Sequence, residues 1–149
     1  MPVARINRPK PAAPEAARPQ ADGADTGAAD DASFDLYYEI HGHDDGAPVL
    51  NIGGSGGDLR RTFPNLLPLN KHFRVLSYDQ CGLGRSDRPD GEYTMAGYAD
   101  DAAALIAHVG WRRCHVMGTS FGGMVALHLA LRHPHLIDRM VLSCTSPGG

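Results

Sequence analysis

Several features that would assign this chain to a class of protein are scarce or missing in its sequence. The three cysteines, Cys81, Cys114 and Cys144, are odd in number, scattered and without metal-ligand spacing. They fit reduced thiols in a cytoplasmic protein better than a disulfide framework. We expect Cys114 and Cys144 to be small buried apolar residues. The formal net charge is only −3, so the composition indicates no surface for nucleic acid.

Long hydrophobic runs are missing too. No apolar segment approaches the roughly 20 residues that cross a bilayer, and the basic N-terminal residues are not followed by the apolar segment of a signal peptide. The patterns G-K-[ST] and G-x-G-x-x-G, which bind nucleotide phosphates, do not occur, and no cofactor or metal ion is implied. We therefore expect a cytoplasmic protein without a membrane or nucleic-acid partner.

The first 33 residues differ in composition from the rest. Residues 1–33 are dominated by Ala, Pro, Gly and Asp, and Ile6 is nearly the only large apolar residue after Val3. Such a segment cannot bury enough apolar surface to offset the entropy lost on ordering. We therefore predict a disordered tail over residues 1–33 and one folded domain over residues 34–149.

From Phe34 onward, segments typical of strands alternate with segments typical of helices. Short β-rich or apolar runs predict strands at residues 35–41, 49–52, 73–78, 114–117 and 139–144. Helical patterns occur at residues 63–69, 94–109 and 121–132. This alternation predicts an α/β fold, with a mostly parallel sheet and helices on both of its faces.

The pentapeptide Gly118-Thr119-Ser120-Phe121-Gly122 is a G-x-S-x-G pattern between a predicted strand and a predicted helix. The backbone must turn sharply there, and glycines at 118 and 122 remove side chains that would collide. This context predicts a nucleophile elbow, a strained turn that lifts the Ser120 hydroxyl above the carboxyl end of the sheet. The alternative is a plain surface turn.

A serine that attacks an acyl carbon needs N–H donors for the oxyanion that forms. The backbone N–H of Phe121, at the start of the helix, is one candidate. The second should come from the glycine loop 53–57, where the backbone N–H of Ser55 is the best placed donor, supported by Gly53 and Gly54. The alternative for this loop is a glycine-rich connector without a role in catalysis.

A serine hydroxyl also needs a base. The groups that follow Ser120 in the chain are His128, His133, His135 and Asp138. His128 lies eight residues along the helix, roughly 12 Å from Ser120, and the other two histidines are farther away. His115 is near the opposite end of its strand, roughly 16 Å away. We therefore expect no complete triad from these residues.

Asp79 ends the predicted strand 73–78 at the same edge of the sheet as Ser120. A catalytic carboxylate is one interpretation. We favour the other, in which Asp79 hydrogen-bonds the loop that follows it, residues 80–87.

Taken together, these motifs resemble the N-terminal half of an α/β-hydrolase over residues 34–149. The segments that carry the resemblance are Leu36–Glu39, Gly53–Gly57, Tyr78–Ser86, the Ser120 elbow and Met140–Ser143. The most similar branch is that of the enol-lactonases and esterases, including 3-oxoadipate enol-lactonase-like proteins. The resemblance implies hydrolysis of carboxylic esters or lactones through an acyl-enzyme on Ser120, without a cofactor.

The chain departs from this family in two respects. Gly53-Gly54 stands where the family usually has His-Gly, so the histidine that braces the oxyanion loop is missing. The strands that carry the family's acid and histidine do not occur in the chain, so the fold is expected to be partial and the chain alone inactive.

Three hypotheses remain open. The chain is part of a serine hydrolase whose remainder is missing from the sequence, a catalytically inactive remnant that acts in binding, or one half of a two-chain hydrolase. The strand 139–144 bears on all three hypotheses. It would be internal in the complete fold, whereas in this chain we expect an exposed apolar edge, a template for aggregation or for strand addition.

Overall fold

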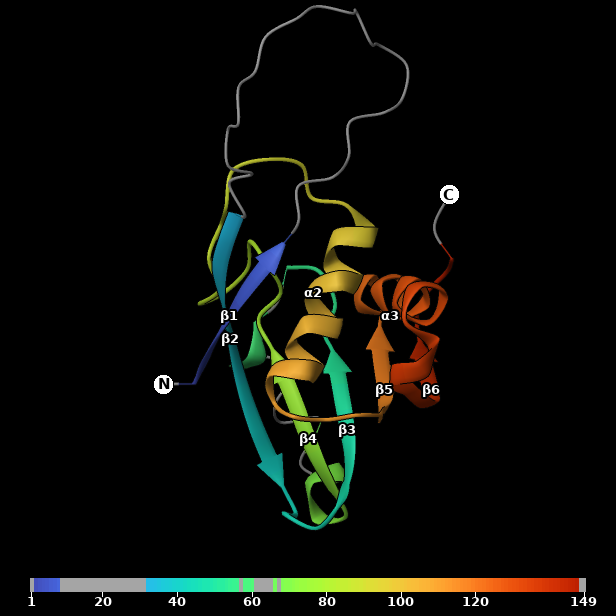
Figure 1. The fold of residues 1–149 in the computed structure, drawn as a ribbon. Coiled ribbons are helices and arrows are strands. Elements are labelled where there is room, and N and C mark those ends of the chain that lie inside the picture. Colours follow the sequence, from blue (N-terminus) through green and yellow to red (C-terminus); the bar gives the residue numbers. More distant parts are fainter. Residues whose placement is uncertain (1, 9–31, 57, 61–65, 67, 148–149) are drawn as a thin grey trace, which may run out of the picture.

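The computed structural model describes residues 2–8, 32–56, 58–60, 66 and 68–147. A six-stranded sheet in the order β1-β2-β4-β3-β5-β6 forms its centre (Figure 1). The strands are β1 (Val3–Arg8), β2 (Ala32–Gly42), β3 (Ala47–Ile52), β4 (Phe73–Tyr78), β5 (Cys114–Thr119) and β6 (Ile137–Ser143). The helices are α2 (Met95–His108) and α3 (Phe121–Arg132), with 3-10 turns at Leu69–Lys71 and Pro134–Leu136.

The sheet is mostly parallel, as predicted. Strand β3 pairs in parallel with both β4 and β5, and β5 pairs in parallel with β6. Only β1 and β2 run antiparallel to their neighbours. Because the carboxyl ends of β3, β4, β5 and β6 meet at one edge of the sheet, the loops that follow these four strands lie next to one another.

The predicted tail over residues 1–33 is wrong at both of its ends. Residues 3–8 form β1, which pairs with the start of β2, and Ala4 and Ile6 are almost fully buried. The two buried residues alternate with exposed ones, which is the period of a strand with one buried face. The composition of the whole segment hides this short pattern. Residues 9–31 lie outside the described residues.

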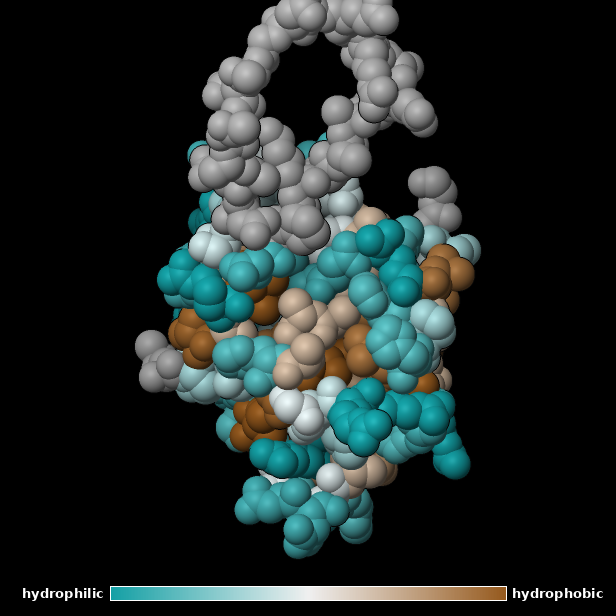
Figure 2. Space-filling model, in the orientation of Figure 1, coloured by the Kyte–Doolittle hydropathy of each residue, from teal (hydrophilic) through white to brown (hydrophobic). Residues whose placement is uncertain are grey.

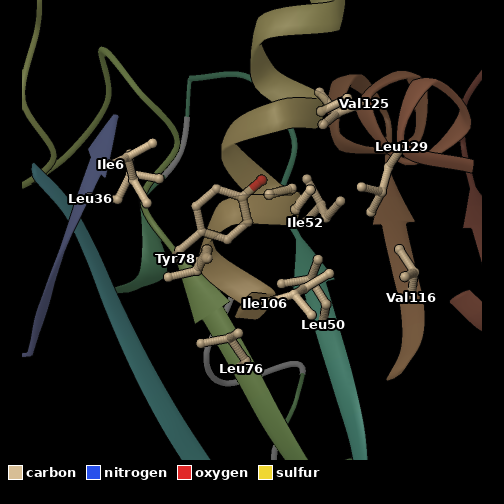
Figure 3. Packing of buried hydrophobic residues seen from close by; sticks show 14 of the residues in the cluster. Ile6, Leu36, Leu50, Ile52, Leu76, Tyr78, Ile106, Val116, Val125 and Leu129 are labelled. Carbon is tan, nitrogen blue, oxygen red and sulfur yellow. The ribbon is translucent and has the colours of Figure 1, made fainter. Parts of the chain in front are cut away.

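The main core lies between the sheet and the two helices. Figure 3 shows Ile106 of α2 and Leu129 of α3 pointing toward side chains of the central strands, among them Leu50 and Leu76. The helices α2 and α3 pack on the same face of the sheet and against each other (Figure 1). On the outer surface of this side, hydrophilic residues surround a smaller apolar area (Figure 2).

A second, smaller cluster covers the opposite face of the sheet. Val49 and Val75 alternate with the core residues of β3 and β4, so they point to the other side, where they pack with Leu66 and Leu69. The helix predicted over residues 63–69 falls largely outside the described residues.

The helix α2 begins as the sequence predicts. Thr94 is the N-cap, and its side chain accepts a 3.0 Å hydrogen bond from the N–H of Gly97. Gly110, at φ +76°, follows the helix, in a left-handed conformation that glycine adopts without strain.

An ionic cluster joins α2 to the end of α3. Asp100 accepts hydrogen bonds from Arg132 at 2.7 and 2.9 Å and contacts Nε2 of His133 at 2.8 Å. Partial burial of Asp100 opposes its ionisation, but the hydrogen bonds from Arg132 and His133 outweigh it and hold the pKa of this carboxyl below its ordinary value. The cluster therefore stabilises the packing of α2 against α3 when Asp100 is ionised.

We predict that Asp100→Asn lowers the free energy of unfolding by about 0.2–1 kcal/mol at pH 7, the range for exposed ion pairs. Because the pKa of Asp100 is lowered in the folded state, its contribution is present above about pH 4 and is lost as the pH falls through the folded-state pKa. Urea unfolding at pH 7 and pH 3 measures this, with Asp90→Asn in an exposed loop as the control. An equal loss at both pH values would contradict the prediction.

Candidate active site

Ser120 lies at the sharp turn between β5 and α3. Its backbone has φ 52° and ψ −122°, a conformation that is strained for any residue other than glycine. The residue is exposed, at the edge of the sheet where the parallel strands end. This is the backbone geometry that the elbow prediction requires.

Two glycines allow α3 to begin so close to the sheet. A Cβ at Gly122 would lie 2.1 Å from the carbonyl oxygen of Ile52 and 2.4 Å from that of Gly53. A Cβ at Gly118 would lie 2.7 Å from the carbonyl oxygen of Gly122. These neighbours are backbone atoms of β3 and α3, which cannot move aside as a side chain can. A larger residue at position 122 would therefore push α3 away from β3, and one at position 118 would push α3 away from β5.

Residues at the end of β6 and just after it hold the turn from the other side. The N–H of Ser120 donates a 2.9 Å hydrogen bond to the carbonyl of Ser143. The carbonyl of Ser120 accepts hydrogen bonds from the N–H of Gly123 at 2.8 Å and from the Thr145 hydroxyl at 2.8 Å. Sequence analysis missed Thr145, because nothing in the local sequence connects it with a turn 25 residues earlier.

The residues predicted to supply the oxyanion donors are Phe121, after Ser120 in the chain, and the glycine loop after β3. Phe121 is the first residue of α3, so its N–H has no acceptor within the helix. Gly53 and Gly54 follow β3, and a Cβ at Gly54 would lie 3.5 Å from the Cβ of Ser120. Ser55 is one residue farther along and is exposed. Gly54 therefore lies beside Ser120, and the backbone N–H of Ser55 stays a predicted donor.

Gln80 supports this loop from the neighbouring strand β4. Its side chain is 3% exposed, and its Nε2 donates a 2.8 Å hydrogen bond to the carbonyl of Gly53. Sequence analysis expected no brace here, because the family's usual histidine is replaced by Gly53. The only signal in the sequence is its place two residues after β4, at the same edge of the sheet, and any polar residue there would give the same signal.

Asp79 organises the loops on this side, as the favoured interpretation predicted. Its carboxylate accepts hydrogen bonds from the N–H of Leu59 at 2.7 Å and from the N–H of Arg85 at 2.9 Å. A Cβ at Gly84 would lie 2.3 Å from an oxygen of this carboxylate. Asp79 thus joins the segment after the glycine loop to the loop after β4, and its oxygens are occupied by structural contacts.

A polar network on β2 continues from Arg85. The guanidinium lies 3.5 Å from the centre of the Tyr37 ring and 3.4 Å from Glu39. Hydrogen bonds from Tyr37 and then from His41 hold the pKa of Glu39 below its ordinary value, and the hydrogen bond to Glu39 raises the pKa of Tyr37. Together these contacts fix the loop 82–86 against β2.

Two histidines make ionic contacts at a distance from Ser120. His115 contacts Asp138 at 3.3 Å near the amino ends of β5 and β6, at the edge opposite Ser120. His133 is held in the Asp100 cluster at the far end of α3. Among residues 2–8, 32–56, 58–60, 66 and 68–147, no hydrogen bond joins the Ser120 hydroxyl to a histidine. The described residues therefore place a candidate nucleophile beside the glycine loop, and the base stays a prediction to be tested.

The cysteine prediction is half right. Cys114 is buried, and burial raises the pKa of its thiol to about 11. Cys144 is exposed, with φ 51°, because it lies in the turn after β6 and outside the sheet. The part of the chain that the structure describes contains no group of side chains that could hold a metal ion. It also contains no helix long and apolar enough to cross a membrane.

The comparison with known protein families decides what this arrangement belongs to. The family model for the alpha/beta hydrolase fold matches residues 47–148. The chain is a member of the alpha/beta hydrolase family. The match includes the glycine loop after β3, the elbow at Ser120 and the residues that follow β6.

Individual hydrolases show the same relationship. The proposed carbamate hydrolase RutD of Yersinia enterocolitica is 44% identical over 110 residues, covering 71% of this chain and 39% of the relative. A hydrolase from Pseudomonas aeruginosa has a TM-score of 0.73 and 37% identity over 76% of this chain and 43% of its own. For the enol-lactonase from Burkholderia xenovorans LB400 the TM-score is 0.73 and the identity 34%, over 76% and 44% of the two chains. The chain spans about two fifths of the length of the curated relatives it matches.

We predict that Gly122→Ala destabilises this hydrolase chain by about 1–3 kcal/mol or prevents its folding, the cost of overpacking a tight contact. The added methyl group would overlap the carbonyls at the end of β3, so α3 must shift. Gly56→Ala is the control, because nothing lies within 4 Å of the position and only the cost of φ +71° is added. Urea unfolding measures the stability of both variants. An equal loss of unfolding free energy in the two would show that the contact of Gly122 with β3 does not restrict the residue at this position.

Proposed function

We propose that this chain carries the nucleophile and oxyanion hole of a serine hydrolase that acts on carboxylic esters or lactones. The observation that carries the proposal is the strained backbone of Ser120 with Gly54 directly beside it. An exposed serine on such a turn, with glycine backbone beside it, supports this proposal, because acyl transfer needs a serine hydroxyl next to N–H donors.

The proposed reaction begins with attack of Ser120 Oγ on the acyl carbon. The carbonyl oxygen gains negative charge in the tetrahedral intermediate, where the N–H groups of Phe121 and of the glycine loop stabilise it. The C–O bond to the alcohol then breaks, the alkoxide leaves and takes up a proton, and the acyl group stays on Ser120. Water hydrolyses this ester in a second step and regenerates the hydroxyl.

The named activities of the relatives support this class of substrate. One is a proposed carbamate hydrolase and another is an enol-lactonase. Carbamates, lactones and esters share an electrophilic carbonyl carbon with a heteroatom leaving group, so one serine and one oxyanion hole would serve them all. We propose esters and lactones for this chain, with carbamates as the substrates that the RutD relatives suggest.

The missing base sets the activity that we expect of the isolated chain. The proton of Ser120 Oγ has no acceptor among the described residues, so attack depends on hydroxide from solvent. An oxyanion hole without a full triad still retains some rate enhancement. We therefore expect slow, single acylation of Ser120 and no saturable turnover. This expectation is the same for all three hypotheses: that the full cycle needs further residues of the protein, that it needs a second chain, or that it has been lost in a remnant that acts in binding.

The test is acylation by p-nitrophenyl acetate, followed by intact mass and peptide mapping. We expect one acetyl group on Ser120, at a rate above that of the exposed serines Ser33, Ser55 and Ser146 in the same sample. The variant Ser120→Ala should lose this adduct and keep the background on the other serines. If the monomer shows saturable turnover, and this turnover disappears in Ser120→Ala, a base is present after all. Acylation of Ser120 no faster than of the other serines would refute the proposal.

We also propose that the chain associates through the edge of β6. This strand is last in the order of the described sheet, and the side chains of Val141 and Leu142 are 60% and 37% exposed. Unpaired backbone groups and apolar side chains on an edge strand favour pairing with another strand.

We expect Val141→Lys to shift the chain toward monomer in size-exclusion chromatography with light scattering, because a charge on the edge opposes strand pairing. Leu131→Lys is the matched control, since Leu131 is 80% exposed on α3 and outside the edge. An equal shift in both variants would indicate general solubility. An unchanged mass for Val141→Lys would exclude association through β6.

The cysteines support a reducing compartment, which we propose is the cytoplasm. All three are free thiols, and Cys81 and Cys114 are buried.

A further inference from the structure

The hydrogen bond from Gln80 controls the orientation of one peptide group beside Ser120. Nε2 of Gln80 holds the carbonyl oxygen of Gly53 at 2.8 Å. The peptide between Gly53 and Gly54 is planar and trans, so its N–H, which belongs to Gly54, points opposite to that carbonyl. Fixing the carbonyl therefore fixes the direction of the N–H of Gly54, the residue that approaches Ser120.

This peptide needs such a constraint more than most. Both of its residues are glycines, which have access to more backbone conformations than any other residue. Rotation of the peptide would exchange the N–H for the carbonyl, and a carbonyl oxygen would repel an oxyanion instead of stabilising it. The loop can therefore support or oppose the reaction, depending on which orientation is populated.

The burial of Gln80 is costly for a residue with only a structural role. The side chain is 3% exposed, and its Oε1 is buried without a hydrogen-bond partner among the described residues. An unsatisfied buried acceptor destabilises a fold. An apolar side chain would avoid this cost, but it would also lose the hydrogen bond to Gly53.

We propose that Gln80 is the positioning residue of the oxyanion loop. By locking the Gly53–Gly54 peptide, it keeps an N–H donor, and not a carbonyl oxygen, available beside Ser120. In this chain it takes over the bracing of the loop, where a glycine replaces the family's histidine. The inference rests on the proposed role of Ser120 in acyl transfer.

The test uses the full chain labelled with ¹⁵N and compares Gln80→Leu with Asn51→Leu. Asn51 is the matched control because it is also a buried amide, 4% exposed, and donates its hydrogen bond to Ser77 at 3.2 Å instead of to the loop. The readouts are the amide chemical shift of Gly54 and the rate of Ser120 acylation by p-nitrophenyl acetate.

We expect Gln80→Leu to move the Gly54 amide resonance and to slow acylation about 10-fold, part of the effect of losing an oxyanion donor. The dependence of the rate on ester concentration should stay the same, because the donor acts in the transition state. Asn51→Leu should change neither readout. An unchanged Gly54 resonance in Gln80→Leu, or equal changes in Asn51→Leu, would overturn the proposal.

Gln80→Glu gives a second test that does not depend on a leucine variant folding. The ionised carboxylate of Glu has no hydrogen to donate, so the hydrogen bond to Gly53 is lost. When the carboxyl is protonated, its O–H can donate to the carbonyl oxygen of Gly53. We therefore expect the Gly54 resonance to return toward the wild-type position as the pH falls, and a pH-independent resonance would overturn the proposal. If wild-type Ser120 is not acylated, the proposed function fails, while the Gly54 resonance in these variants still decides the role of Gln80.

Discussion

The contact between Gly122 and the end of β3 is the constraint on which the rest of the site depends. The helix α3 can begin directly after Ser120 only because no side chain separates it from the carbonyls of Ile52 and Gly53. That contact sets both the sharp turn at Ser120 and the distance between the turn and the glycine loop. Two elements far apart in the sequence are thereby placed within the few ångströms over which a serine and its oxyanion donors must act together.

Polar side chains then fix the loops that this contact brings together. Asp79 holds the segment after the glycine loop and the loop after β4, Gln80 holds Gly53, and Thr145 holds the carbonyl of Ser120. Each of these residues directly follows a parallel strand or lies within two residues of its end. The sheet supplies a common edge, and short side chains at that edge are sufficient to fix loops that are rich in glycine.

Much of this arrangement could be predicted from the sequence, because the signals are local. The elbow at Ser120, the cap at Thr94 and the strand–helix alternation each depend on neighbouring residues. Gln80 could not be predicted in the same way, since its hydrogen bond reaches a carbonyl 27 residues earlier and any polar residue there would look like an ordinary loop residue. The strand 3–8 was missed because two buried apolar residues are too few to alter the composition of their segment. The predicted burial of Cys144 was wrong because burial at this position depends on where β6 ends.

The strained backbone of Ser120 also has a consequence for the order in which the protein folds. Its N–H and carbonyl are held by Ser143 and Thr145, more than 20 residues later in the chain. Such distant contacts form late, because closing the intervening loop costs entropy before the contact is gained. During synthesis, a nascent chain that has not yet exposed Thr145 outside the ribosome would contain Ser120 as an ordinary serine. The strained turn at Ser120 would thus be complete only after the residues that follow β6 have left the ribosome.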